Sequence, residues 1–316
     1  MKMVLVTGGT GVVGAPIVAL LVAGGAQVRC LVRDPRSAAT VLPGAELIAG
    51  DIEDADQVGA AMAGCDTVFH SAGIPEQWTR DPAIFQRVNC GGTANVLAAM
   101  RASGTRRLLH VSTQDTFDLT RDPMDETMPS RDPHPSHYEG SKIAAQKLVD
   151  RAGAEGMDVR SIHPCAVYGP GAIRPTGMTA LLWGLRLGKV PALLPGGLPV
   201  VHNADVAKGA LLALEKGAPG SHYILCESYQ TLRQMAEAVH ARFPDAPLPR
   251  EMPLWLAKVL AGVGDPLGRL FGVKPMLGKG ELSTLIRTGR PSAAKARREL
   301  GWTARPFAEG LESTFQ

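Results

Sequence analysis

The sequence predicts an α/β protein built on a doubly wound parallel sheet, with a smaller C-terminal lobe interleaved with it. Three observations predict this fold class. Short apolar runs alternate with helix-like runs through the first half of the 316-residue chain, the order expected of parallel strands and crossover helices. The first apolar run leads into four glycines within positions 8–14. After about residue 170, proline and glycine become dense and the alternation stops.

The expected elements follow from the periodicity of apolar residues. Five short apolar runs predict strands at 2–8, 26–34, 45–51, 65–73 and 106–113. Three runs with helical spacing end at glycine and predict helices at 15–25, 55–64 and 91–104. Later helical runs span Val206–Lys216 and Leu232–Phe243. We therefore divide the chain into a unit over 1–170 and a lobe over 171–316, with segments around 200–225 returning to the first unit.

Composition narrows the class of protein. The chain has 33 basic and 30 acidic residues and a net charge of +3, with no basic block, which argues against nucleic acid as a partner. The most apolar later segment, 181–201, contains Arg186, Lys189, Pro191 and Pro195, so it is a poor membrane span. Residues 1–6 are needed as a strand rather than as a signal peptide. We expect a cytoplasmic protein with no membrane partner.

Cysteine and histidine spacing predicts neither disulfides nor a metal site. The five cysteines are far apart and form no CxxC pair, so we expect reduced packing residues. They are Cys30, Cys65, Cys90, Cys165 and Cys226. The eight histidines show no HExxH or HxxxH spacing.

The glycine segment predicts a nucleotide site. Gly9, Gly11 and Gly14 give G-x-G-x-x-G, and Thr7 with Gly8, Gly11 and Gly14 gives T-G-x-x-G-x-x-G. Between a strand and a helix, such a turn lets the backbone approach a pyrophosphate at the helix N-terminus. The alternative is a tight turn without a ligand. We therefore assign 1–170 as the dinucleotide-binding domain and 171–316 as mainly the substrate-binding lobe.

The end of the second strand indicates which nucleotide binds. An NAD-binding unit usually carries an acidic residue there, whereas this chain has Arg33 followed by Asp34, with Arg36 close by. An arginine fork suits a 2′-phosphate. We expect NADPH or NADP+ to be preferred, while Asp34 leaves NAD(H) possible. In the alternative interpretation, Arg33 is solvated and pairs with Asp34.

A second motif predicts acid–base chemistry. Tyr138 and Lys142 form Y-x-x-x-K, and residues four apart share one face of a helix. A neighbouring cation lowers the pKa of a phenol, so Tyr138 becomes a usable proton donor or acceptor. Ser112 and Thr113 end a predicted strand at the edge where open α/β sheets bind ligands. A hydroxyl at that edge can bond the reacting oxygen.

The ordered motifs resemble the extended short-chain dehydrogenases/reductases, the epimerase/dehydratase-like branch with a Rossmann fold. The motifs that carry the resemblance are TGGTGVVG (7–14), AGDI (49–52), VFHSAG (68–73), VNCGGTANVL (88–97), VST (111–113), YEGSK (138–142), HPCAVYGPG (163–171), VHNADVAKGALLAL (201–214) and KARRELGW (295–302). They cover nearly the whole chain. The motifs around Asp205 and Trp302 look structural.

The resemblance implies roles for individual residues. Tyr138 would be the general acid/base, Lys142 would lower its pKa and hold the nicotinamide ribose, and Thr113 matches the catalytic Ser/Thr. Asn89 would support the site from its helix. The expected cofactor contacts are Gly8, Thr10, Gly11, Val12, Val13, Arg33, Asp51, Ile52, Ala72, Gly73, Tyr138, Lys142, Pro164, Cys165 and Val167.

The reaction is chosen among variants of the family. In dehydratases of the family, the sequence after the Ser/Thr strand resembles S-T-D-E-V-Y-G. This chain has Gln114 in place of the first acid. An amide cannot donate a proton as an acid does, so dehydration is disfavoured. Epimerases keep NAD bound, and Arg33 argues against that. We expect NADPH-dependent reduction of a ketone or aldehyde, or oxidation of the matching secondary alcohol, as in dihydroflavonol-reductase-like and 3β-hydroxysteroid-dehydrogenase-like proteins. The alternatives are an NAD-dependent nucleotide-sugar epimerase and a non-catalytic NADP(H)-binding protein.

The small-molecule substrate is expected between the lobes, in a pocket whose aromatic and apolar walls suit a hydrophobic ketone. The candidate walls are Trp78, Asp115, Tyr168, Arg174, Trp183 and His202. Trp78 and Trp183 could instead be lobe packing, Arg174 a surface charge and Asp115 a solvated loop carboxylate. The resemblance also implies a homodimer through the helices carrying 89–103 and 138–154.

Overall fold

The computed structural model describes residues 3–75, 79–130, 136–271 and 277–315. Its large sheet has seven parallel strands in the order β3-β2-β1-β4-β5-β6-β9. They are β1 (Met3–Thr7), β2 (Gln27–Val32), β3 (Glu46–Ala49), β4 (Thr67–His70), β5 (Arg107–Val111), β6 (Asp158–Pro164) and β9 (His222–Leu225). The predicted doubly wound fold is confirmed, and the five predicted strands are the first five of this sheet.

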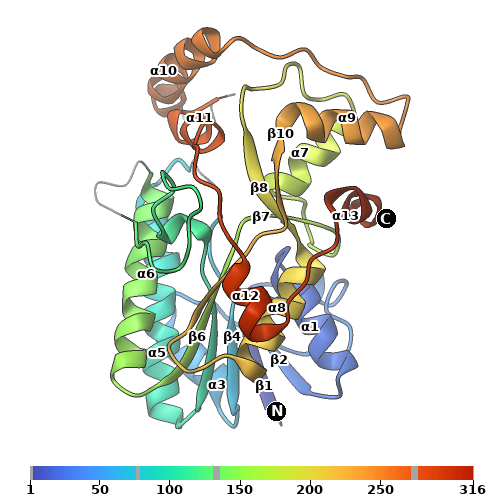
Figure 1. The fold of residues 1–316 in the computed structure, drawn as a ribbon. Helices are drawn as coiled ribbons and strands as arrows, with labels where there is room; N and C mark the ends of the chain where they lie inside the picture. The colour runs from blue at the N-terminus through green and yellow to red at the C-terminus, as the bar shows by residue number, and fades with distance from the viewer. Residues whose placement is uncertain (1–2, 76–78, 131–135, 272–276, 316) are drawn as a thin grey trace.

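Helices cover both faces of the large sheet (Figure 1). One face carries α1 (Gly14–Ala23), α8 (Asn203–Lys216) and α12 (Ala294–Leu300), and the other carries α3 (Ala55–Met62), α5 (Gly92–Ser103) and α6 (His137–Ala154). Strand β1 shows how the sequence builds both layers. Val4 and Val6 pack into the first core and Leu5 into the second, because successive side chains of a strand point to opposite faces.

The second lobe is built around a small sheet of order β10-β8-β7. Its strands are β7 (Ala166–Tyr168), β8 (Gly197–His202) and β10 (Ser228–Thr231). Its helices are α7 (Gly177–Arg186), α9 (Leu232–Arg242), α10 (Leu254–Phe271), α11 (Lys279–Leu285) and α13 (Phe307–Thr314). The chain passes between the sheets more than once, since β8 lies in the small sheet and β9 pairs with β6 in the large one.

Short connecting elements lie at the carboxyl ends of the strands of the large sheet. They are α2 (Pro35–Ala38) after β2, α4 (Ala83–Phe85) and a π-helix (Gln86–Gly91) before α5, and the 3₁₀ turn η2 (Gln114–Thr116) after β5. Strands β1 and β4 are neighbours, although β2 and β3 lie between them in the sequence. The chain therefore reverses its winding direction at β1 and β4, and this is the position where open α/β sheets bind ligands.

Two findings concern membrane-spanning helices and metal sites. In the described ranges, no helix is both long and apolar enough to cross a membrane. Over the same residues, no group of three His, Cys, Asp or Glu side chains could hold a metal ion.

Candidate active site and cofactor-binding loop

The glycine loop between β1 and α1 is tightly packed except at Gly11. Gly8 has a φ of 70°, and a Cβ there would lie 2.5 Å from the amide nitrogen of Ala72. A Cβ on Gly14 would lie 2.1 Å from the carbonyl oxygen of Gly8. At the exposed Gly11, the contact for a Cβ is at 3.3 Å, again to the Gly8 carbonyl oxygen. This cradle fits the pyrophosphate of a dinucleotide, because backbone can approach it closely where side chains are missing.

Gly14→Ala is expected to destabilise the fold and to abolish dinucleotide binding. The added methyl group meets backbone rather than a flexible side chain, and such overpacking costs about 1–3 kcal/mol. Thermal unfolding and NADPH titration check both effects. Gly59→Ala in α3 is the matched control, since a Cβ there has nothing within 4 Å and alanine favours helix. A Gly14→Ala protein that unfolds and binds like the parent would contradict the tight cradle.

Other loop residues connect the cradle to the segment before α7 in the second lobe and to α8 on the large sheet. The carbonyl oxygen of Thr10 accepts from the amide of Ile173 at 3.3 Å, and that of Val12 accepts from Asn203 Nδ2 at 3.0 Å. Val13 precedes α1 and packs against the first core. The loop is therefore held in place by both lobes.

At the end of β2, the two arginines and the aspartate have different roles. Arg33 and Arg36 are exposed. The Asp34 carboxylate caps α2, accepting from the amide of Arg36 at 3.0 Å and the hydroxyl of Ser37 at 2.5 Å. These bonds, that of the Ser37 hydroxyl first, lower the pKa of Asp34. Asp34 therefore serves the cap rather than an Arg33 pair.

The remaining predicted cofactor residues follow β3, β4 and β6 at the same edge of the sheet. Asp51 accepts from the amide of Glu53 at 3.0 Å, while the buried Ile52 packs against Gly92. Ala72 donates its amide to Thr7 Oγ1 at 3.3 Å. The list is completed by Gly73 after β4, by Pro164 at the end of β6 with Cys165 directly after it, and by Val167 within β7.

Tyr138 and Lys142 lie one turn apart on α6, as the Y-x-x-x-K spacing predicts. Tyr138 is half-buried, with its ring edge-on to Phe85 at 6.4 Å between centroids. Lys142 is buried and donates from Nζ to the carbonyl oxygen of Val111 at 3.0 Å. Burial lowers the pKa of Lys142 to about 8. The lysine therefore fixes α6 to the end of β5, from which Thr113 continues.

Asn89 supports the first turn of α6 from the π-helix. Its Nδ2 donates to Ser141 Oγ at 2.9 Å, and Ser141 Oγ donates to the carbonyl oxygen of Tyr138 at 2.7 Å. Its Oδ1 accepts from the amide of Ile74 at 2.7 Å. Asn89 thus connects the loop that follows Gly73 to the helix turn carrying Tyr138. π-Helical turns of this kind are frequent at functional sites.

Thr113, which caps η2, and Asp115 within η2 form a buried pair. Thr113 Oγ1 donates to Asp115 Oδ2 at 3.0 Å. Asp115 is buried, and this burial raises its pKa although Arg287 opposes the shift. The interpretation of Asp115 as a solvated loop carboxylate is wrong, because its side chain is buried against Thr113 and Arg287.

Sequence reasoning missed Arg287. It follows α11 in the second lobe, yet its Nη2 donates to Glu139 Oε1 at 2.6 Å, and its Nη1 lies 3.7 Å from Asp115 Oδ1. Glu139 stands next to Tyr138. No local pattern marks this arginine, since 148 positions separate it from Glu139. Only the packing of the second lobe brings the two together.

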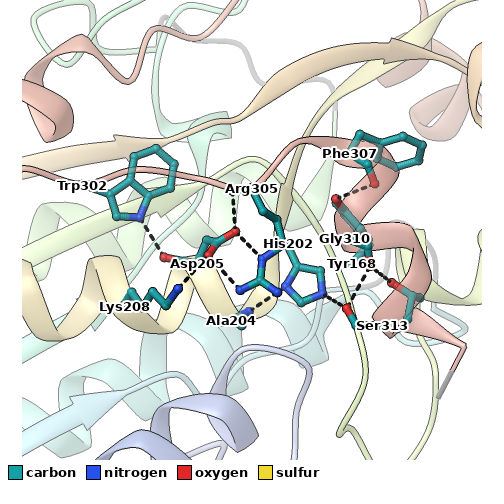
Figure 2. Close-up of polar contacts among 11 residues, drawn as sticks. Tyr168, His202, Ala204, Asp205, Lys208, Trp302, Arg305, Phe307, Gly310 and Ser313 are labelled. Atoms are coloured by element: carbon teal, nitrogen blue, oxygen red, sulfur yellow. Dashed lines mark hydrogen bonds and ion pairs between the residues drawn. The ribbon is translucent and has the colours of Figure 1, made fainter.

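Two predicted pocket residues have packing roles instead. Tyr168 is fully buried, its ring 5.2 Å from both His202 and Phe307, and its hydroxyl donates to the Phe307 carbonyl oxygen at 3.4 Å. His202 caps α8 through the amide of Ala204 at 3.2 Å and bonds Ser313 at 2.9 Å (Figure 2). Burial lowers the pKa of His202 to about 4. The prediction that Tyr168 and His202 line the substrate pocket is therefore wrong.

The other wall residues have different environments. Trp183 packs edge-on against Phe315 at 5.1 Å, which is the lobe-packing alternative. Arg174 is exposed in the loop before α7, as the surface-charge alternative has it. Trp78 lies outside the described residues. Asp115 alone among the described wall residues lies beside the predicted catalytic residues.

The two motifs considered structural contact each other. Asp205 accepts from Arg305 Nε at 2.9 Å and Nη2 at 3.1 Å, and its carbonyl oxygen accepts from Trp302 Nε1 at 2.8 Å (Figure 2). Trp302 is buried in the first core. They fasten the C-terminal segment to α8.

Comparisons with known proteins agree with the fold and the motifs. The model of the NAD dependent epimerase/dehydratase family matches residues 4–226. The chain is 31% identical to 4-hydroxy-2-methyl-3-oxo-4-farnesyl-3,4-dihydroquinoline-1-oxide ketoreductase of Stigmatella aurantiaca, over 98% of this chain and 95% of that protein. It is 30% identical to 3 beta-hydroxysteroid dehydrogenase/Delta 5-->4-isomerase of Mycobacterium tuberculosis, over 95% of this chain and 85% of that protein.

A solved structure supports the same family assignment. The crystal structure of gox2253 is 31% identical, with a TM-score of 0.84, and the match covers 100% of this chain and 97% of that one. The protein belongs to the NAD-dependent epimerase/dehydratase family, the extended short-chain dehydrogenases/reductases. It is an NAD(P)-dependent oxidoreductase, as the ordered motifs predicted.

Proposed function

We propose that the protein reduces a ketone or aldehyde on a mostly hydrophobic small molecule with NADPH, or oxidises the matching secondary alcohol. One observation carries the proposal: Tyr138 and Lys142 share a face of α6, and Lys142 bonds the end of β5 two residues before Thr113. NADPH, when bound, supplies the hydride. Tyr138 donates its phenolic proton to the oxygen, Thr113 binds that oxygen and Lys142 keeps the phenol acidic.

The residues at the sheet edge fit the cofactor. The loop from Gly8 to Gly14 would hold the pyrophosphate, and Asp51 with Ile52 would lie beside the adenine. Ala72 and Gly73 would pass the cofactor with their backbone. Pro164, Cys165 and Val167 would line the nicotinamide pocket. The exposed Arg33 supports a 2′-phosphate, because Asp34 is engaged in capping α2.

Arg33→Ala is expected to raise the Kd for NADPH by roughly tenfold or more, since a charge-assisted bond contributes about 1.5–3 kcal/mol. The Kd for NADH should change by less than about twofold, because NADH has no 2′-phosphate. Calorimetric titration of both nucleotides checks this. The control is Arg242→Ala. Arg242 is exposed on α9 and pairs with Glu312 at 3.2 Å. Equal weakening of both nucleotides would contradict the assignment.

The names of two similar proteins support a hydrophobic substrate. The names of the two relatives describe a farnesyl-bearing ketone and a steroid. The alternative of an NAD-dependent nucleotide-sugar epimerase is supported by the family name. Incubating the protein with NADPH and a panel of hydrophobic ketones, while following NADPH consumption, tests the proposal. NADPH bound without turnover over the whole panel would favour the non-catalytic alternative.

We also propose a homodimer through α5 and α6, which lie side by side on one face of the large sheet. The buried Ile143 and Val149 of α6 face the protein interior, so any contact between subunits would use the outer side of the helix. The cytoplasmic location expected from the sequence stays a prediction.

A further inference from the structure

A buried group of charges lies beside the proposed catalytic residues and has no part in the reaction described above. It consists of Asp115 on η2, Glu139 on α6 and Arg287 from the segment after α11. Their side chains are 10%, 4% and 19% exposed. Arg287 bonds Glu139 and lies 3.7 Å from Asp115. Three elements from both lobes therefore meet at one ion cluster.

The cluster is incompletely bonded in a specific way. Within the described residues, Asp115 Oδ1 and Arg287 Nη1 are buried without a hydrogen-bond partner, while Asp115 Oδ2 accepts from Thr113 Oγ1 at 3.0 Å. Burying a carboxylate is costly unless a charge or hydrogen bonds compensate it. Arg287 supplies the charge and Thr113 a hydrogen bond. Both interactions favour the ionised carboxylate of Asp115, against burial, which raises its pKa.

The ionised carboxylate fixes the direction of the Thr113 hydroxyl. A carboxylate can only accept, and a threonine hydroxyl has a single proton to donate. With that proton directed at Asp115, and with one lone pair accepting from the Asp115 amide at 3.3 Å, Thr113 Oγ1 offers only its other lone pair to a reacting oxygen. A hydroxyl group can donate to that lone pair, and a ketone oxygen cannot.

We propose that Asp115, held by Arg287, is a positioning residue that makes Thr113 a hydrogen-bond acceptor, so that the site binds the alcohol form of its substrate in preference to the ketone. The inference rests on the proposed reaction at the same site and adds which form of the substrate it recognises. Reduction proceeds after Thr113 turns its proton from Asp115 to the ketone oxygen. No atom is gained or lost in that turn.

The test compares alcohol and ketone binding without turnover. The alcohol is titrated against the NADPH complex and the matching ketone against the NADP+ complex, and the ratio of the two Kd values is measured. In Asp115→Asn, the side-chain amide donates to Thr113 and frees its proton. We expect the ratio to shift toward the ketone by about tenfold, since a hydrogen bond to a charged group contributes about 1.5–3 kcal/mol. A merely structural role would weaken both ligands alike.

Further variants show whether Asp115 acts through Thr113. Once Thr113→Val has removed the hydroxyl, adding Asp115→Asn should leave the ratio unchanged. Arg287→Met should shift the ratio in the direction of Asp115→Asn, and Arg287→Lys should restore it. Arg186→Met, which removes a partly buried partner of the exposed Asp245 at 2.8 Å, is the control and should leave the ratio as it is. An unchanged ratio in Asp115→Asn would overturn the inference while the reductase proposal stands.

A separate readout covers the case in which no ketone or alcohol binds. Thermal unfolding of Thr113→Val, Asp115→Asn and the double variant forms a cycle that needs no substrate. Non-additive shifts of the unfolding midpoint would support the Thr113–Asp115 bond even though the reductase proposal had failed. Additive shifts would overturn the inference, because the two side chains would then act independently.

Discussion

Replacing Tyr138 with phenylalanine is expected to lower kcat for carbonyl reduction by about 10²–10⁴-fold, the contribution of a positioned acid–base group. Phenylalanine keeps the ring and its edge contact with Phe85, so the local packing should survive. The Kd for NADPH should change little, because the glycine loop and Arg33 carry most of the proposed contacts. Steady-state kinetics and NADPH titration on the same preparation measure both quantities.

Tyr229→Phe is the matched control for Tyr138→Phe. The Tyr229 ring lies under Arg290, with the guanidinium carbon 3.6 Å from the ring centroid, and phenylalanine preserves that stacking. This variant should keep its kcat. If Tyr138→Phe turned over at a rate near that of the parent, Tyr138 would not be the proton donor.

Replacing Lys142 with methionine is expected to lower activity and raise stability together. The charge that should keep Tyr138 acidic is lost, so we expect kcat to fall by at least about a hundredfold. Burial holds the pKa of Lys142 at about 8, below its ordinary value of 10.5. Folding therefore opposes the charged form, and methionine removes a cost of up to roughly 3 kcal/mol, which the lost bond to the Val111 carbonyl oxygen partly offsets. Stability gained with activity lost distinguishes a functional residue from a packing residue.

The pH dependence of this effect has a definite sign. Below about pH 8, Lys142 is charged in both folded and unfolded chains, so the full cost of burial applies. Between about 8 and 10.5, the unfolded chain binds the proton more strongly, and the penalty declines as pH rises. The stabilisation by Lys142→Met should therefore be largest below pH 8 and shrink above it. Unfolding in denaturant at several pH values measures this.

Activity of the parent should fall as pH rises through the same region, because the charged lysine is lost there. Asp115 favours that charge. Burial lowers the pKa values of His70, His110 and His163, so these neighbours stay neutral and do not contribute to the profile. Lys147→Met, exposed on the same helix, should change neither activity nor stability. A Lys142→Met protein with parental activity would contradict the role.

Local sequence patterns predicted much of the fold and part of the site. The glycine spacing predicted the cradle between β1 and α1, since Gly8 and Gly14 meet backbone within a few positions or across one strand pair. The Y-x-x-x-K spacing predicted that Tyr138 and Lys142 share one face of α6, because this depends only on helix geometry. Such features are decided by neighbours in sequence or by adjacent strands.

The predictions that were wrong or incomplete concern contacts between segments that lie far apart in the sequence. Tyr168 and His202 are polar aromatics that we predicted in the pocket wall, but α13 covers them with Phe307 and Ser313. Arg287 reaches the site from the segment after α11, and α10 and α11 are not among the helices predicted from the sequence. The strands of the small sheet are likewise hard to predict, because β7 and β10 are short and β8 contains Gly197 and Pro199. Burial and lobe packing, which composition alone does not determine, decided these positions.

The most direct measurement of the central claim is hydride transfer itself. NADPH carrying deuterium at nicotinamide C4 would be incubated with the protein and a hydrophobic ketone, and the product would be examined by mass spectrometry. We predict an alcohol with one deuterium on the former carbonyl carbon, formed by the parent and not by Tyr138→Phe. A protein that transfers no deuterium to any ketone, and instead releases stoichiometric NAD+ on denaturation, would contradict the reductase proposal and favour the epimerase alternative.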